Sequence, residues 1–326
     1  MISSTYTKIA KDRRFIIRTP KLTTVFLMIA LPLFLLGMIS PKYITSLVTD
    51  IVIFSIYAMG YDILLGFTNQ FSYGQALYFG LGAYGVLLSV LHMGVNLWTG
   101  IIIALTICVF ISLLLGSLSV RLTGAYFVII TIIFNLVFYF LALSWVWLTG
   151  GDDGLTFTVP PLDFLLIKLS LNDHIVKFCF IFSLFIISFL ILERLISSPL
   201  GRIFIGIREN EERLTFLGYD VFRYKLIAYV VSALFSGLSG ALYAIRLGYA
   251  SAEFFSLSLS ALPIVYTLVG GMGTLIGPVI GTIIILPFTY FVGALWKHYF
   301  IIVGALIILL LKFNPKGVIG YIMKYR

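Results

Sequence analysis

Charged residues are scarce in this sequence of 326 residues. Lys, Arg, Asp and Glu together make up 11% of it, against about 25% in a typical soluble domain. Hydrophobic residues make up 61% even without glycine, whereas soluble domains reach about 45–50% with glycine included. So few charges could not cover so large an apolar core in water. Soluble, fibrous, disordered and disulfide-stapled classes are therefore excluded, and the composition indicates an integral membrane protein.

Residues that carry catalysis or bind metals are also few. The sequence has three widely separated histidines and two cysteines, Cys108 and Cys179. Both cysteines lie in apolar runs, so we interpret them as small buried side chains and not as a disulfide. No P-loop, H-E-x-x-H or G-x-S-x-G motif occurs. We expect no catalytic residues, metal or cofactor, and the lack of a clustered basic surface argues against nucleic-acid binding.

Long apolar runs dominate the chain. A membrane span needs about 20 apolar residues, and the sequence offers ten candidates: 22–39, 44–66, 73–92, 97–119, 124–148, 175–196, 226–247, 257–270, 275–296 and 299–311. We expect an all-α protein of about ten transmembrane helices, with eight or nine as the alternative. The last three runs are short or glycine-rich, so half-helices are possible there. The expected organisation is a tail over 1–21, a transmembrane domain over 22–312 and a second tail over 313–326.

The distribution of basic residues predicts the orientation. Residues 1–21 carry six basic residues and one acid, and no small-x-small cleavage pattern follows the first apolar run, so we expect a retained span with its N-terminus in the cytoplasm. Counting through ten spans places Arg121, residues 193–225 and the tail 312–326 on the same side. That side then holds 17 of the 22 basic residues, so both termini are predicted to be cytoplasmic in an inner (plasma) membrane protein.

Two connections between the apolar runs carry no charge, 67–72 (FTNQFS) and 271–277 (GMGTLIG). We predict broken or re-entrant segments near 66–75 and 270–278, because irregular backbone at membrane depth is tolerated where it is buried or lines a cavity. Tight turns with small residues at helix contacts are the alternative. The polar side chains at and beside the first connection are candidate pathway residues: Asp62, Asn69, Gln70, Ser72, Tyr73 and Gln75.

Two carboxylates lie in the second apolar run, and burying either one is costly. Asp50 is expected to pair with a basic neighbour or to lie in a wet cavity. Asp62 is the better functional candidate because it adjoins the polar connection. Asp62 could couple transport to protons, or it could hold backbone and polar groups of the broken segment in place without changing its ionisation.

The segment 197–225 is the longest charged stretch after the N-terminal tail. Ser198 can cap a helix, Pro199 suits its first position, and Gly218 can end it. The first part, 199–206, is a helix or, because of its glycines, a turn. We favour a surface helix that docks a soluble partner over a solvated loop. Its candidate coupling residues are Arg202, Arg208, Glu209, Asn210, Glu211, Glu212 and Gly218.

This segment resembles the coupling loop of permeases from branched-chain amino acid (Liv-type) ABC importers, whose pattern is close to G-R-x-x-x-A-I-R-E-N-E. Further blocks are similar to that family in the same order: GFTNQFSYGQALYFGLGAYG (66–85), RLTGAYFVIITIIF (121–134), TGGDDGL (149–155), LVGGMGTLIGPVIG (268–281) and FNPKGVIG (313–320). The R-L-x-G-x-Y-F block looks more like the M-type subunit. Asn69, Tyr73 and Gln75 depart from the family's usual residues.

The resemblance implies a permease subunit of an ATP-driven importer that hydrolyses no ATP itself. Its expected partners are two ATP-binding subunits, a paired related permease and an extracytoplasmic solute-binding protein. The expected substrate is a branched-chain amino acid, with urea or a short amide as the alternative. An ion-coupled secondary transporter that uses Asp50 and Asp62, or a channel-like membrane subunit, are the alternatives of another class. Neither needs a docking loop at 199–218.

Overall fold

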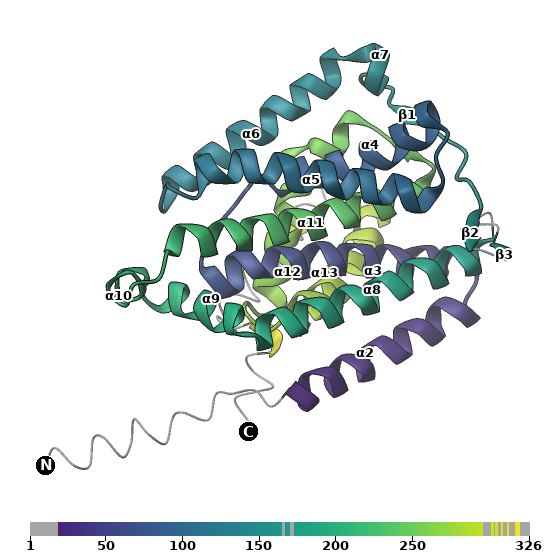
Figure 1. Ribbon diagram of the computed structural model, residues 1–326. Coiled ribbons are helices and arrows are strands. Elements are labelled where there is room, and N and C mark those ends of the chain that lie inside the picture. The colour runs from purple at the N-terminus through teal and green to yellow at the C-terminus, as the bar shows by residue number, and fades with distance from the viewer. Residues whose placement is uncertain are drawn as a thin grey trace, which may run out of the picture.

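The computed structural model describes residues 19–164, 167–169 and 173–295, together with 301, 302, 304, 305, 308, 312 and 317–319. Eight of the helices in the described part are long and apolar enough to cross a membrane, and Figure 1 shows most of them running roughly parallel. These helices are α2 (Thr19–Ile39), α3 (Lys42–Asp62), α4 (Gln75–Met93), α5 (Leu97–Ser119), α6 (Ala125–Ser144), α8 (His174–Ser197), α11 (Val221–Leu247) and α13 (Ile276–Leu295).

The shorter elements lie at the ends of these helices or between them. They are a π-helical turn (Ile63–Phe67) that continues α3, α7 (Val146–Thr149), α9 (Pro199–Glu209), α10 (Glu211–Phe216), a 3-10 turn (Ala252–Phe255) and α12 (Leu257–Gly270). The strands are β1 (Leu155–Thr156), β2 (Leu162–Phe164), β3 (Ile167–Leu169) and β4 (Tyr249–Ala250). β1 pairs with β4 and β2 with β3, both antiparallel.

Nine of the ten predicted apolar runs coincide with helices, which confirms the all-α membrane fold. The exception to a full span is α12, whose 14 residues cover only about 21 Å at 1.5 Å per residue, against a hydrocarbon core of about 30 Å. The tenth run, 299–311, and the two predicted tails fall mostly outside the described residues.

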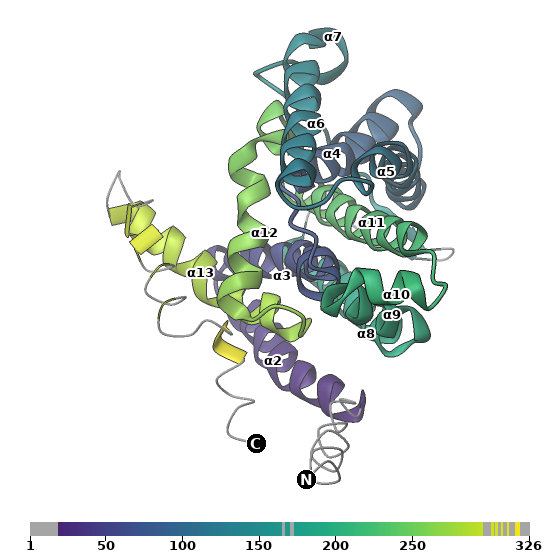
Figure 2. The ribbon, with the colours of Figure 1, turned by 90° about the vertical axis from the view of Figure 1, so that its left-hand side faces the viewer.

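Helix α3 and its π-helical extension form the centre of the bundle. Nearly every residue of this span is buried, because α2, α8, α11, α12 and α13 all pack around it, as Figure 2 shows. By contrast, α2, α5 and α6 are mostly exposed within the chain and present leucine, isoleucine and phenylalanine on their outer faces. Apolar side chains on those faces are suited to lipid or to a partner's helices.

Helices α4 and α11 approach each other through glycine. A Cβ on Gly82 would lie 1.9 Å from the carbonyl oxygen of Gly237, and one on Gly240 would lie 1.9 Å from that of Phe79. Within a membrane, helices associate largely by such close van der Waals packing of small residues. This contact fixes α4, and with it the connection that precedes α4, against α11.

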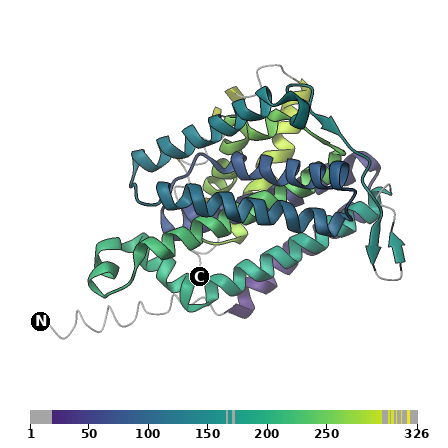
Figure 3. The same cartoon turned by 45° about the horizontal axis from the view of Figure 1, so that its top comes forward.

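The first and last residues of helix α11 lie at opposite ends of the bundle. Near its start, the Arg121 guanidinium lies 5.4 Å from the ring centre of Phe222, so the α5–α6 turn and the α9–α10 segment share one end. At its finish, β4 pairs with β1, which places the loop after α7 at the other end. Figure 3 shows the strands gathered at that end, away from α10. This grouping agrees with the predicted grouping of these loops.

Candidate coupling and transport site

The first break lies between α3 and α4. The α-helix ends at Asp62, a π-helical turn follows over Ile63–Phe67, and residues 69–74 are not helical. Asn69 has a left-handed backbone with φ 56°, which asparagine tolerates better than most residues. The hydroxyl of Thr68 and the backbone N–H of Gln70 both donate to the carbonyl of Leu64, at 2.8 and 2.9 Å. The backbone N–H of Thr68 donates to the same carbonyl, so three donors converge on Leu64 and fix the end of the π-helical turn.

The second break joins α12 to α13 over residues 271–275. Gly271, Gly273 and Leu275 all have positive φ angles, 123°, 73° and 57°. Such a backbone suits glycine, and Leu275 adopts it only because the surroundings fix it. The Thr274 hydroxyl accepts from the N–H of Gly277 at 2.9 Å and so caps the start of α13. The helices are interrupted at both predicted places. At the second place, α12 and α13 pack against each other through Gly270 and Gly281, which also fits the alternative of a tight turn with small residues at a helix contact.

Asp62 joins the two breaks. Its carboxylate accepts from the backbone N–H of Gly273 at 2.7 Å and from that of Leu275 at 3.1 Å. The side chain is fully buried, where an unpaired N–H costs about 1–3 kcal/mol. Asp62 therefore holds the backbone of the second break against the end of α3. This is the holding role anticipated for a carboxylate here, although the backbone it holds lies 211 residues away.

The charged segment after α8 folds as two short helices. Pro199 occupies the first turn of α9, which suits its fixed φ, and 199–206 is helical despite its two glycines. The buried residues of α9 are Gly201, Phe204 and Ile207, so an apolar face against α8 and α11 stabilises the helix. Asn210 ends α9 and caps α10 by accepting from the N–H of Arg213 at 2.9 Å.

Arg208 connects this surface helix to the breaks. Its guanidinium donates to the carbonyl oxygen of Gly66 within the π-helical turn. A Cβ on Gly273 would lie 2.6 Å from the same guanidinium nitrogen and 3.0 Å from the Gly66 oxygen. The end of α9, the first break and the second break therefore meet at one place. Gly66 and Gly273 are the residues that sequence reasoning missed here, and their only signal was their position in the two predicted breaks, near 66–75 and 270–278.

The other candidate coupling residues divide into two groups. Glu211 forms an ion pair with the buried ammonium of Lys225 on α11, and Gly218 ends α10 with φ 86°. These two, like Asn210, shape the segment. Exposed side chains form the other group: Arg202, Glu209 and Glu212. The sequence reasoning also missed Phe216 and Leu217, which are 89% and 67% exposed at the tip of α10.

The neutral polar residues of the first break contact several different helices. Gln75 accepts from the Ser236 hydroxyl of α11 at 2.9 Å, and its side-chain NH₂ is buried without a partner in the described part of the chain. The carbonyl of Ser72 accepts from Tyr61 of α3 at 3.0 Å, and the N–H of Tyr73 donates to Thr131 of α6 at 3.1 Å. Their role in a solute pathway stays a prediction.

Exposure within the break differs sharply from residue to residue, which gives a labelling prediction. Asn69 is exposed, whereas Gln70, Ser72 and Gln75 are buried. In a chain with both cysteines replaced by alanine, we expect Asn69→Cys to react with a water-soluble maleimide at least tenfold faster than Ser72→Cys. Replacing Cys179 is necessary because it is partly exposed, contrary to the expected burial, while Cys108 is buried as expected.

The nucleotide state should change the labelling rates if this break opens during transport. If the chain works in an ATP-driven assembly, as the sequence resemblance implies, labelling at position 72 or 75 is expected to rise in one nucleotide state. The test is a comparison of rates with and without ATP and a trapping agent. Equal, negligible labelling at both buried positions in every state would contradict a water-accessible pathway beside this break.

Comparison with known proteins agrees with this geometry. The model of a family described as a branched-chain amino acid transport system permease component matches residues 43–311. The chain belongs to this family. The match includes both breaks, the Asp62 carboxylate that joins them, and the α9–α10 segment.

Named relatives support the same conclusion. High-affinity branched-chain amino acid transport system permease proteins LivM from Salmonella typhimurium and Escherichia coli are each 26% identical over 84% of this chain and 69% of their own length. A probable LivM permease from Methanocaldococcus jannaschii is 24% identical over 40% of this chain and 42% of its own. No solved structure matches the chain. The resemblance to M-type permeases is therefore confirmed, and the chain is a multi-pass transport permease component.

Proposed function

We propose that this chain is the transmembrane permease subunit of an ATP-driven importer that moves branched-chain or related hydrophobic amino acids across the inner membrane. The family match over residues 43–311 and the names of the two bacterial relatives support this substrate class. Both termini and the α9–α10 segment face the cytoplasm in this proposal, because basic residues gather on the cytoplasmic side of such proteins.

The observation that carries the proposal is the contact of Arg208 with Gly66. It joins a helix on the surface to the backbone of the buried turn that follows α3. The ATP-binding subunits dock on α9 and α10, and α9 moves as a rigid body because its backbone is hydrogen-bonded within the helix. The Arg208 guanidinium then carries this displacement to the first break. Asp62 passes it to the second break through Gly273 and Leu275.

The docking surface consists of charged and apolar side chains together. Arg202, Glu209 and Glu212 are exposed along the segment, and Phe216 and Leu217 are exposed at its tip. Exposed aromatic and aliphatic anchors with charges around them are typical of protein–protein interfaces. The proposed assembly contains two ATP-binding subunits that hydrolyse ATP, a paired related permease and an extracytoplasmic solute-binding protein.

Asp62 lets one experiment separate ATP-driven from proton-driven transport. Asp62→Asn keeps an oxygen that accepts one of the two backbone bonds but cannot ionise. We expect reconstituted transporter with this substitution to retain a substantial level of uptake, because asparagine still accepts from one of the two buried N–H groups. Uptake of labelled leucine should require ATP inside the proteoliposomes and should not respond to a protonophore.

The control for this experiment is Asp153→Asn, which changes an exposed carboxylate in the loop after α7 and should leave uptake unchanged. Uptake driven by an imposed pH gradient without nucleotide, and lost in Asp62→Asn, would overturn the ATP-driven proposal. The energetics favour ATP: one proton crossing 100 mV gains about 2.3 kcal/mol, which supports only about 50-fold accumulation. Uptake of urea or a short amide in place of leucine would redirect the substrate assignment alone.

A further inference from the structure

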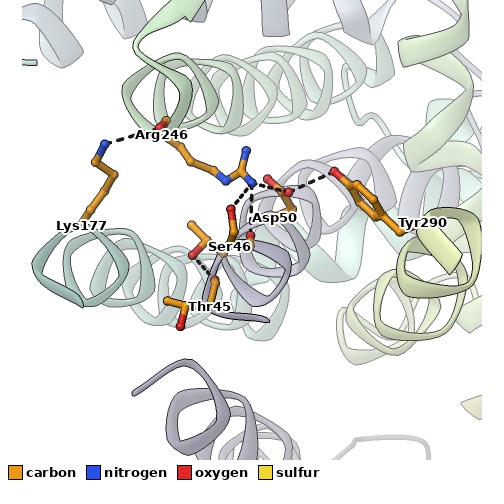
Figure 4. A network of polar contacts seen from close by, with 7 residues as sticks. Thr45, Ser46, Asp50, Lys177, Arg246 and Tyr290 are labelled. Carbon is orange, nitrogen blue, oxygen red and sulfur yellow. Dashed lines mark hydrogen bonds and ion pairs between the residues drawn. The ribbon is translucent and has the colours of Figure 1, made fainter. Parts of the chain in front are cut away.

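The end of α11 remote from α9 carries a polar network around Asp50. The Asp50 carboxylate forms an ion pair with Arg246 at 2.7 Å and accepts from the Tyr290 hydroxyl at 3.1 Å. Arg246 also donates to the side-chain oxygen of Ser46 at 2.7 Å, and Lys177 donates to the Arg246 carbonyl at 3.4 Å. Figure 4 shows these side chains converging from α3, α8, α11 and α13. Asp50 is therefore paired with a basic neighbour.

A cavity of about 200 Å³ lies beside this network. Its lining includes three Lys or Arg side chains, one histidine and a serine hydroxyl: Lys42, Lys177, Arg246, His174 and Ser46. Only five basic residues of the chain fall on the predicted outer side, and three of them meet here from α3, α8 and α11. Basic residues are rare on this side of the protein, and these three come from distant parts of the sequence. Random placement does not explain why they meet at one cavity.

The cavity carries an excess of positive charge. Asp50 pairs with Arg246, but no ion pair reaches Lys42 or Lys177 among the residues that the structure describes. The nearest acid in sequence to the lining, Asp173, is exposed and accepts the N–H of Ile175 at 3.2 Å. The cavity also lies at the first turns of α3 and α8, whose helix dipoles add positive potential, and at the last turn of α11, whose dipole opposes it, so the excess positive charge comes from the side chains. An oxyanion is the ligand that this charge distribution favours.

The rim of the cavity is apolar. Each of three basic lining residues has an exposed apolar neighbour in sequence: Tyr43 beside Lys42, Ile175 beside His174, and Leu247 beside Arg246. These residues lie at the ends of membrane-spanning helices, which is the depth of lipid head groups. A free anion would gain nothing from an apolar rim, whereas an amphiphile would bury its first carbons there. The volume is below the about 300 Å³ of small-molecule pockets, which suits a phosphate group at its base with the rest of the amphiphile outside.

We propose that this cavity, formed by Lys42, Lys177 and Arg246, binds the phosphate group of an anionic phospholipid at the outer membrane surface. Lys42 and Lys177 supply the free cationic N–H donors, and the Ser46 hydroxyl, which accepts from Arg246, has its own proton available for the ligand. The ion pair with Asp50 holds the Arg246 side chain in place in the lining of the cavity. Basic pockets between transmembrane helices recognise lipid head groups by this chemistry.

Native mass spectrometry of the purified full chain, titrated with phosphatidylglycerol or phosphatidylcholine, tests the proposal. We expect phosphatidylglycerol to bind at least fivefold more tightly than phosphatidylcholine. Lys42→Gln and Lys177→Gln should each weaken phosphatidylglycerol binding about fivefold, and together about 25-fold, since a basic side chain near a lipid surface contributes about 1 kcal/mol. Phosphatidylcholine binding should not change in either variant.

Two further variants test whether a loss of lipid binding comes from misfolding and not from the lost charges. The double substitution Lys42→Arg with Lys177→Arg keeps both charges and should retain selective binding. Arg223→Gln removes a basic side chain at the opposite end of α11, where Arg223 is 79% exposed and pairs with Asp220, and should have no effect. Phosphatidylglycerol affinity that is unchanged in the double glutamine variant would overturn the proposal.

Two other sources of an oxyanion give distinct results. Displacement of phosphatidylglycerol by millimolar inorganic phosphate would assign the cavity to a soluble phosphate and overturn the lipid assignment. Loss of solute-binding protein association in the double glutamine variant, with lipid binding unchanged, would assign the basic side chains to a partner's carboxylates instead. Selective lipid binding with neither of these results supports the proposal.

Discussion

Gly66→Ala is expected to reduce ATP-driven uptake at least tenfold, because it inserts a methyl group where three segments meet. The new Cβ would lie 1.9 Å from a carboxylate oxygen of Asp62 and 2.4 Å from the backbone nitrogen of Gly273. Asp62 cannot turn away without releasing two buried N–H groups, and overpacking of this kind costs about 1–3 kcal/mol. The displaced turn also carries the carbonyl that Arg208 contacts.

The measurement is leucine uptake into proteoliposomes that contain the assembled transporter and internal ATP. Gly100→Ala in α5 is the matched control, because its nearest neighbour would be an ordinary 3.5 Å from the new Cβ; it should leave uptake unchanged. A thermal unfolding curve for each variant separates loss of transport from loss of fold. Normal uptake by Gly66→Ala would show that the two breaks need not pack closely during transport.

Charge reversal at Arg208 and Glu209 together is expected to abolish solute-stimulated ATP hydrolysis while leaving membrane insertion intact. The two side chains contribute differently. Arg208 reaches inward to Gly66, so Arg208→Gln alone should keep the ATP-binding subunits attached but lower the stimulation at least tenfold. Glu209 is exposed, so Glu209→Lys should weaken attachment of those subunits instead.

The ATPase activity of the reconstituted complex, measured with and without loaded solute-binding protein, tests this division. Co-purification of the ATP-binding subunits reports attachment separately. Arg223→Gln serves as the control for removing a basic side chain from the same end of the bundle, and it should change neither quantity. Full solute stimulation in the doubly reversed variant would place the coupling contact elsewhere.

The positions of the spans were predictable because each span is encoded locally. A transmembrane helix satisfies its own backbone hydrogen bonds, so an apolar run of sufficient length suffices to specify it. The absence of charge from the two connections 67–72 and 271–277 predicted where the helices are interrupted. The segment 199–206 was ambiguous, because Gly201 and Gly206 lower helix propensity. Burial of Phe204 and Ile207 decided in favour of a helix, and that burial depends on α8 and α11.

The sequence by itself determined the membrane class, nine of the helices, both breaks and the charged surface segment. Only the tertiary structure decided what the polar residues contact. Asp62 meets Gly273 across 211 residues, and Arg208 meets Gly66 across 142. Asp50 meets Arg246 from another helix. Periodicity and composition describe neighbours along one helix, whereas these partners are set by how separate helices pack. Helix packing in a membrane depends on the shapes of small residues at many contacts at once.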